Sequence, residues 1–323
     1  MTSRALKIGV LLPLWTDSYA GRTPRLREVI RFAQHAETVG LDSVWLTDHL
    51  YWEAYVDFRA VGMEPPEEWK GVKGGQWECW TAAAALAVQT HKLHIGTLVT
   101  NTCLRNPALL ARTADNVQEL SDGRLILGLG AGDFVSEHLA YGFDFERHVA
   151  RFEEALDVVL PLLEGKRFSH SGEFHRLEDA QLLPRAEHGR PPVLIGTLKG
   201  KPRMSRLVAQ HADLWNCMIA FGDCALQTYL DARAPILAAC ERYGRDPATL
   251  SCGATVAVNF TQEPYAIVPT STPFSGSVSA IAERFFEYAE AGVEHISVIP
   301  QPWNETGLDG LGEVVEWLSR QTK

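Results

Sequence analysis

One stretch constrains the fold more than any other: a helix, a buried strand and a glycine-rich loop that follow one another between Asn106 and Asp133. Asn106 can cap the helix, and Pro107 suits its first turn because the missing N–H would have no helical partner there. Residues 125–129 (LILGL) then form a strand without a polar face, which is typical of parallel strands covered by helices on both sides. This stretch is one unit of an α/β protein, so the fold depends on how often the unit recurs.

Similar apolar strands recur along the chain, and a helical pattern follows each of them. Eight such units predict a (β/α)₈ TIM barrel that forms a single domain over residues 1–323. A doubly wound open sheet is the alternative, but no GxGxxG motif follows the first strand. The predicted strands are residues 6–12, 43–47, 94–99, 125–129, 193–196, 213–217, 253–260 and 295–299.

Two segments do not fit the repeating unit. Residues 50–76 contain aromatic residues, prolines and glycines without a clear period, which predicts an insertion or lid after the second strand. Residues 167–183 alternate in polarity and turn at Ser171-Gly172, which predicts a surface hairpin before the fifth strand.

The charge and the cysteines exclude several classes of protein. The formal net charge of −10 argues against nucleic acid or an anionic membrane as a partner. The six cysteines form no CxxC pair, which indicates a reduced, cytoplasmic protein without a zinc site. The apolar run 8–15 is interrupted by Pro13, so it reads as a first strand and not as a signal peptide.

In a TIM barrel the active site lies at the C-terminal ends of the strands, so the residues there are the candidates. His49 follows the second strand and can exchange a proton with a reacting oxygen; alternatively, Asp48 fixes it only to shape the loop. Asp133 follows the fourth strand and is either a general acid or base, or a helix cap. The HExxH motif does not occur and the strand ends lack a histidine–carboxylate cluster, so we expect no metal site. The GxSxG motif of a serine nucleophile is also absent.

The remaining strand ends carry small, polar and aromatic residues, which suit a flat cofactor that does the chemistry itself. Thr100 and Asn101 would bind the cofactor edge, or merely turn the chain. The basic loop 196–203 would hold an anion at a helix N-terminus, with residues 275–277 as a rival phosphate site. The predicted cofactor-binding residues are Asp48, Thr100, Asn101, Gly130, Ala131, Gly132, Gly196, Thr197, Lys199, Gly200, Lys201 and Asn216, and the predicted substrate residues are Trp15, Trp52 and Trp215.

The chain resembles the luciferase-like family of flavin-dependent oxidoreductases over nearly its whole length. The resemblance rests on residues 40–45 (GLDSVW) with Asp48-His49, on GTLVTNTCLRNPALLA from Gly96, on LSDGRLILGLGAGDF and on EAGVEHISVIP. It implies a (β/α)₈ barrel that binds either FMN or the deazaflavin coenzyme F420, often as a homodimer.

The Asp48-His49 pair is similar to that of the F420-dependent branch, in which the histidine lies beside the reactive ring. That branch can carry a glutamate acting as acid or base where Asp133 stands, whereas many relatives have a tryptophan there. Residues 196–201 are similar to the phosphate loop of the family. The resemblance therefore implies F420-dependent hydride transfer to or from a small organic substrate. An FMN-dependent monooxygenase that uses reduced flavin and O₂ is the alternative, and a flavin-binding barrel without turnover is the third hypothesis.

Overall fold

Eight parallel strands pair in the order in which they occur along the chain and close into a barrel. The computed structural model describes residues 6–18, 21–197, 201–265 and 271–321. The last strand pairs with the first, and the fifth pairs with the fourth, so that each barrel strand has two neighbours. The predicted (β/α)₈ barrel is therefore confirmed. The barrel strands are β1 (Lys7–Leu11), β2 (Ser43–Leu46), β5 (His94–Thr97), β7 (Leu125–Gly130), β10 (Val193–Thr197), β11 (Leu214–Met218), β12 (Ser251–Asn259) and β14 (His295–Gln301).

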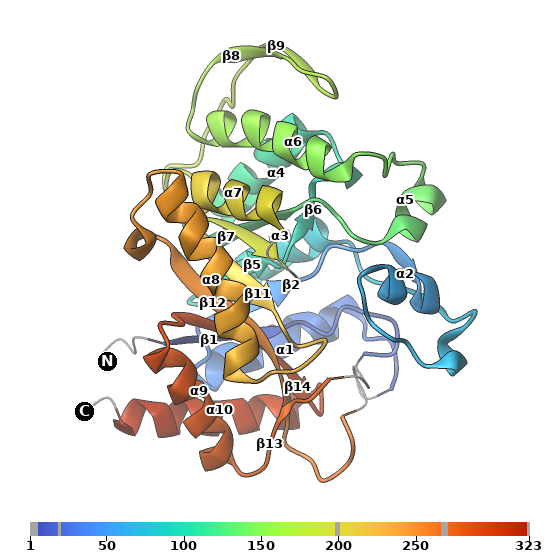
Figure 1. The fold of residues 1–323 in the computed structure, drawn as a ribbon, viewed down its shortest axis with the longest axis vertical. Helices are drawn as coiled ribbons and strands as arrows, with labels where there is room; N and C mark the ends of the chain where they lie inside the picture. Colours follow the sequence, from blue (N-terminus) through green and yellow to red (C-terminus); the bar gives the residue numbers. More distant parts are fainter. Residues whose placement is uncertain (1–5, 19–20, 198–200, 266–270, 322–323) are drawn as a thin grey trace.

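Helices surround this barrel (Figure 1). The helix predicted after Asn106 forms as expected, since the Asn106 side chain accepts hydrogen bonds from the N–H groups of Ala108 and Leu109. Gly123, which follows this helix, has a φ of +80°, a conformation that favours glycine. The outer helices are α1 (Leu26–Thr38), α3 (Cys79–Gln89), α4 (Pro107–Leu120), α6 (His148–Leu163), α7 (Pro202–His211), α8 (Leu226–Arg242), α9 (Val278–Glu290) and α10 (Glu305–Gln321).

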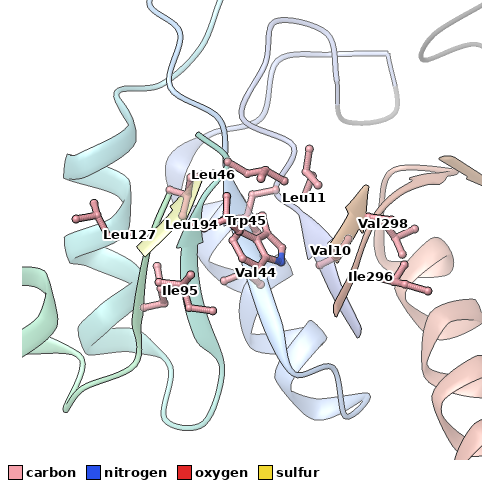
Figure 2. Close-up of a cluster of buried hydrophobic side chains, with 14 of the residues drawn as sticks. Val10, Leu11, Val44, Trp45, Leu46, Ile95, Leu127, Leu194, Ile296 and Val298 are labelled. Atoms are coloured by element: carbon pink, nitrogen blue, oxygen red, sulfur yellow. The ribbon is translucent and has the colours of Figure 1, made fainter. Parts of the chain in front are cut away.

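The interior of the barrel is filled, and Trp45 of β2 is its largest contributor. Its side chain is buried among apolar residues of the neighbouring strands (Figure 2). Glycines face the indole from both sides, since a Cβ on Gly96 would lie 2.2 Å from Trp45 Cε3 and one on Gly9 would lie 2.5 Å from Trp45 Nε1. Because side chains close the barrel in this way, a ligand has to bind at the ends of the strands.

Residues 50–76 form a small unit of their own. Strands β3 (Tyr51–Glu53) and β4 (Lys73–Gly75) pair in antiparallel fashion, and α2 (Ala54–Ala60) and the 3₁₀ turn η1 (Glu67–Trp69) lie between them. We call this unit the lid.

Further short elements lie outside the eight repeated units. The predicted hairpin is present as β8 (Phe168–Ser171) and β9 (Arg176–Ala180). A seven-residue helix, α5 (Val135–Tyr141), was not predicted; it follows β7 and lies beside the lid (Figure 1). The others are β6 (Thr100–Asn101), β13 (Phe274–Ser275), η2 (Thr102–Leu104) and η3 (Pro247–Thr249).

The six cysteines are free thiols. Within the described part of the chain, no helix combines the length and the hydropathy needed to cross a membrane.

Candidate active site

His49 lies at the C-terminal end of β2 between two carboxylates. Its Nδ1 is 3.2 Å from Glu137 Oε1, and its Nε2 is 4.0 Å from Asp133 Oδ1. The Glu137 side chain is fully buried, whereas 40% of the Asp133 side chain and 19% of the His49 side chain are exposed. Nδ1 therefore faces the protein interior, and Nε2 faces the side that a substrate can reach. The structure thus brings together the two residues that were predicted to be catalytic.

These carboxylates determine the proton affinity of the histidine. Burial by itself lowers the pKa of His49, but the hydrogen bond and the charge of Glu137, assisted by Asp133 and Asp48, raise that pKa to about 9. Burial raises the pKa of Asp133, although the nearby imidazole opposes this. At neutral pH His49 is therefore an imidazolium, a group that can donate a proton from Nε2.

Glu137 is the residue of this site that the sequence did not reveal. It lies on α5, and its Oε2 accepts a hydrogen bond of 2.8 Å from the N–H of Leu50, the first residue of the lid. A carboxylate four residues after Asp133 was the only sequence signal, and the stretch has no helical period long enough to place it.

The amide of Asn101 supports Glu137 from the other side. Asn101 Oδ1 accepts from the N–H of Cys103 at 3.0 Å, which orients the amide so that Nδ2 lies 3.4 Å from Glu137 Oε1 and 3.0 Å from His138 Nε2. Burial lowers the pKa of His138, consistent with a neutral ring that accepts this hydrogen bond. The side chain of Asn101 is therefore occupied by contacts within the protein.

A second lid contact uses the residue before Glu137. The buried Asp57 of α2 accepts hydrogen bonds from the Ser136 N–H at 3.2 Å and from the Ser136 hydroxyl. Asp57 also accepts from the N–H of Glu53 at 2.7 Å. The helix α5 thus holds the lid at two adjacent residues.

The Asp48 carboxylate is bound by other groups of the protein. Its fully buried carboxylate pairs with both terminal nitrogens of Arg105, one of them at 3.0 Å, and accepts the N–H of Asn101 at 2.9 Å. Arg105 also approaches Glu78, the residue that caps α3, at 3.5 Å. Asp48 therefore ties the end of β2 to β6 and α3, and the side chain is not accessible to a ligand.

An aromatic cluster lies against one side of His49. Phe134 stacks on the imidazole with centroids 4.3 Å apart, and Phe58 of the lid packs edge-on against Phe134 at 5.2 Å. Trp15 packs edge-on against Trp52 of the lid at 6.1 Å. Two of the predicted substrate residues, Trp15 and Trp52, thus belong to one aromatic wall between the barrel and the lid.

The third predicted substrate residue, Trp215, lies elsewhere. It is fully buried in the barrel wall beside Tyr229, and its Nε1 donates to Thr197 Oγ1 at 2.9 Å. The side chain of Asn216 is also buried and accepts from Thr255 at 2.9 Å. In this structure Trp215, Thr197 and Asn216 therefore serve the packing of the barrel.

The predicted glycines pack closely against neighbouring side chains. A Cβ on Gly130 would lie 2.5 Å from Val99 Cγ2, and one on Gly196 would lie 3.1 Å from Val99 Cγ1. Gly132 has a φ of +79° and faces the Asn101 amide. The half-buried Val99 therefore lies over the ends of β7 and β10, and Ala131, which follows β7, is also half-buried.

The remaining predicted cofactor residues differ in exposure. Thr100 is fully buried, and its hydroxyl has no hydrogen-bond partner in the described part of the protein. Lys201 is exposed at the N-cap of α7. Lys199 and Gly200 lie outside the described residues.

The described residues offer no metal site, and a surface hollow among them contains none of the candidate residues. Among the residues that the structure describes, no three His, Cys, Asp or Glu side chains are placed to share a metal ion. A surface hollow of about 550 Å³ is lined by Val39 and by residues of α10, and contains none of the residues above. The site at the strand ends is therefore the best candidate for chemistry.

The fold and this site define a (β/α)₈ barrel with a histidine–carboxylate pair at the C-terminal ends of its strands, the usual location of an active site in such barrels. The chain belongs to the luciferase-like monooxygenase family, whose model matches residues 6–268. The resemblance inferred from the sequence is thereby confirmed.

Two curated relatives are similar over much of the chain. One is the F420-dependent glucose-6-phosphate dehydrogenase of Amycolatopsis mediterranei, 29% identical over 215 residues, which are 65% of this chain and 57% of that enzyme. The chain thus spans little more than half the length of this relative. The other is the phthiodiolone/phenolphthiodiolone dimycocerosates ketoreductase of Mycobacterium kansasii, 28% identical over 293 residues, which are 84% of this chain and 76% of that enzyme.

Solved structures share the fold. An F420-dependent secondary alcohol dehydrogenase in complex with an F420–acetone adduct superposes with a TM-score of 0.76 at 18% identity, covering 97% of this chain and 99% of that one. A riboflavin lyase with modified FMN and riboflavin superposes with a TM-score of 0.78 at 16% identity, covering 98% and 92%. At this level of identity the likeness concerns the fold alone.

Proposed function

We propose that this protein is an oxidoreductase that uses coenzyme F420 to transfer a hydride to or from a small organic substrate. The observation that carries the proposal is the reachable His49–Asp133 pair at the strand ends of a barrel of this family. The similar proteins support it, because two of them are F420-dependent dehydrogenases, one of which acts on secondary alcohols, and the third is a ketoreductase.

The residues present fit such a cofactor in two respects. Thr100 offers a buried hydroxyl that has no hydrogen-bond partner among the described residues, and its neighbour Val99 offers an apolar surface. At the end of β10, α7 begins with Pro202 and has no acidic residue in its first turn, so its free N–H groups and Lys201 suit a phosphate. We propose that Lys199 and Gly200 complete this phosphate site.

When bound, the deazaflavin supplies or accepts the hydride. The chain itself handles the proton: His49 Nε2 gives a proton to the substrate oxygen or takes one from it, and Asp133 orients the imidazole from its exposed side. Phe134 and the lid aromatics exclude water around the imidazole, which strengthens the interaction between His49 and a developing negative charge.

An FMN-dependent monooxygenase is the second candidate, and the riboflavin lyase structure with modified FMN favours it. Titration of the purified protein with F420 and, separately, with FMN distinguishes the two. We expect F420 to bind at micromolar or lower concentration and FMN to bind at least tenfold more weakly. Submicromolar binding of FMN without binding of F420 would refute the first candidate.

The third hypothesis, a barrel that binds a flavin without turnover, predicts that His49→Ala changes stability alone. We expect that variant to bind F420 as wild type does and to lose turnover. We further propose that the protein is a cytoplasmic homodimer of one domain per chain that binds neither nucleic acid nor membranes. The net charge of −10 supports the absence of nucleic-acid and membrane binding, and the free thiols support the cytoplasm. The homodimer rests on the family resemblance, and light scattering measures it.

A further inference from the structure

We propose that Glu137 is a positioning residue that holds His49 as an imidazolium with its Nε2–H directed at the substrate oxygen, so that the site is built to reduce a carbonyl. The role of Glu137 follows from the structure of the protein alone. The direction of the reaction rests on the proposed function, and the experiment below separates the two.

Hydrogen-bond donors surround the carboxylate of Glu137. An ionised carboxylate only accepts hydrogen bonds, and the partners of Glu137 are the N–H of Leu50, the amide nitrogen of Asn101 and Nδ1 of His49. The Asn101 amide is oriented by the N–H of Cys103, so it donates to Glu137. His49 therefore carries a proton at Nδ1, and the nitrogen that remains for a substrate is Nε2.

The charges around His49 also favour its protonated form. Asp48 is compensated by Arg105, whereas no Lys or Arg in the described part of the chain forms an ion pair with Glu137. Asp133 faces Nε2 from the loop after β7. Burial raises the pKa of Asp133, and the charge of the more distant Asp57 of the lid raises it further. A buried carboxylate without a cation is costly, so the fold favours a positive charge on its hydrogen-bonded imidazole.

The protonated imidazole fits one direction of reaction. In carbonyl reduction a hydride from the reduced deazaflavin forms the new C–H bond, and the π electron pair of C=O moves to oxygen. That oxygen takes the Nε2 proton of His49, whose N–H bonding pair stays on nitrogen. The reverse reaction needs a neutral Nε2 to accept the alcohol proton, which the charge of Glu137 opposes at neutral pH.

The experiment measures the titration of His49 without any cofactor. Protein labelled with ¹³C at histidine Cε1 is titrated by NMR from pH 5 to pH 10, and the His49 signal is assigned by its loss in His49→Gln. We expect a midpoint near 9 in the wild type. In Glu137→Gln the carboxylate charge is lost, so we expect a midpoint at least two pH units lower.

The chain offers a matched control. Glu154 is also a nearly buried carboxylate that binds a histidine, His170 at 3.3 Å, and backbone N–H groups of the hairpin. Glu154→Gln makes the same chemical change away from the site and should leave the His49 midpoint unchanged. Glu137→Asp keeps the charge on a shorter side chain, and it should return the midpoint at least halfway to that of the wild type.

Activity then tests the direction. For a ketone that the wild type reduces with reduced F420, a midpoint that falls from about 9 to about 6.5 predicts that Glu137→Gln is slower by about thirtyfold at pH 8 and by less than twofold at pH 6. A wild-type midpoint below 7, or one that Glu137→Gln moves by less than half a pH unit, would overturn the role of Glu137. Absence of F420 binding together with the expected titration would refute the proposed function alone.

Discussion

Replacement of Asp48 by asparagine tests whether this residue is structural, as its environment indicates. The substitution keeps an acceptor for the Asn101 N–H but removes the charge opposite Arg105, of which 15% is exposed. Removal of one partner of a buried ion pair costs about 3–5 kcal/mol, because the other charge remains buried. Glu78 at 3.5 Å compensates in part, so we expect Asp48→Asn to lower the free energy of unfolding by about 3 kcal/mol.

Urea-induced unfolding followed by circular dichroism and tryptophan fluorescence measures this change. The control is Asp179→Asn, because the Arg167–Asp179 pair is exposed by 64% and 57% and its loss should cost less than about 1 kcal/mol. Adding Arg105→Met to Asp48→Asn removes the uncompensated charge and should restore at least about 1 kcal/mol. If Asp48→Asn unfolds within 1 kcal/mol of the wild type, the argument from the buried pair is wrong.

Two other predictions concern packing and pH. In Gly96→Ala the new methyl group would meet Trp45 at 2.2 Å, so we expect a loss of about 1–3 kcal/mol in the same assay. The methyl group added in Gly222→Ala would meet none of the described atoms outside its chain neighbours within 4 Å, so that variant should stay within about 0.5 kcal/mol. The pKa of His49 is about 9 in the folded protein and ordinarily near 6.5, so its stabilising contribution is complete below pH 6.5 and is lost as the pH rises through 9. Compared with His49→Gln, the wild type should therefore lose up to about 3 kcal/mol of stability between pH 6.5 and pH 10, and a constant difference between the two would contradict the raised pKa.

The sequence predicted the barrel because its strongest signals are local. Apolar strands without a polar face, the cap at Asn106 and the glycine at 123 each depend on a few adjacent residues. His49 and Asp133 could be predicted for the same reason, because the C-terminal end of a parallel strand can be read from its pattern.

The remainder of the site depends on contacts between distant segments. The helix α5 is too short to show a period, and its position is set by the lid, so Glu137 could not be recognised. The prediction that Trp215 contacts the substrate failed because β11, buried at its three central residues, gives no sign of which side chains face a ligand. Asp48 was assigned to the cofactor because its partner, Arg105, lies 57 residues further along the chain.

The attachment of the lid to α5 has a consequence for chimaeric proteins and for natural variation. Ser136 and Glu137 each bind a different part of segment 50–76, through Asp57 and through the N–H of Leu50. A lid grafted from another member of the family would bring a different residue opposite Ser136. It would also shift the N–H of Leu50, which shares the Glu137 carboxylate with His49. We therefore expect substrate range to be exchanged between homologues only when the graft includes both the lid and residues 135–141, and we expect the two segments to covary among related sequences.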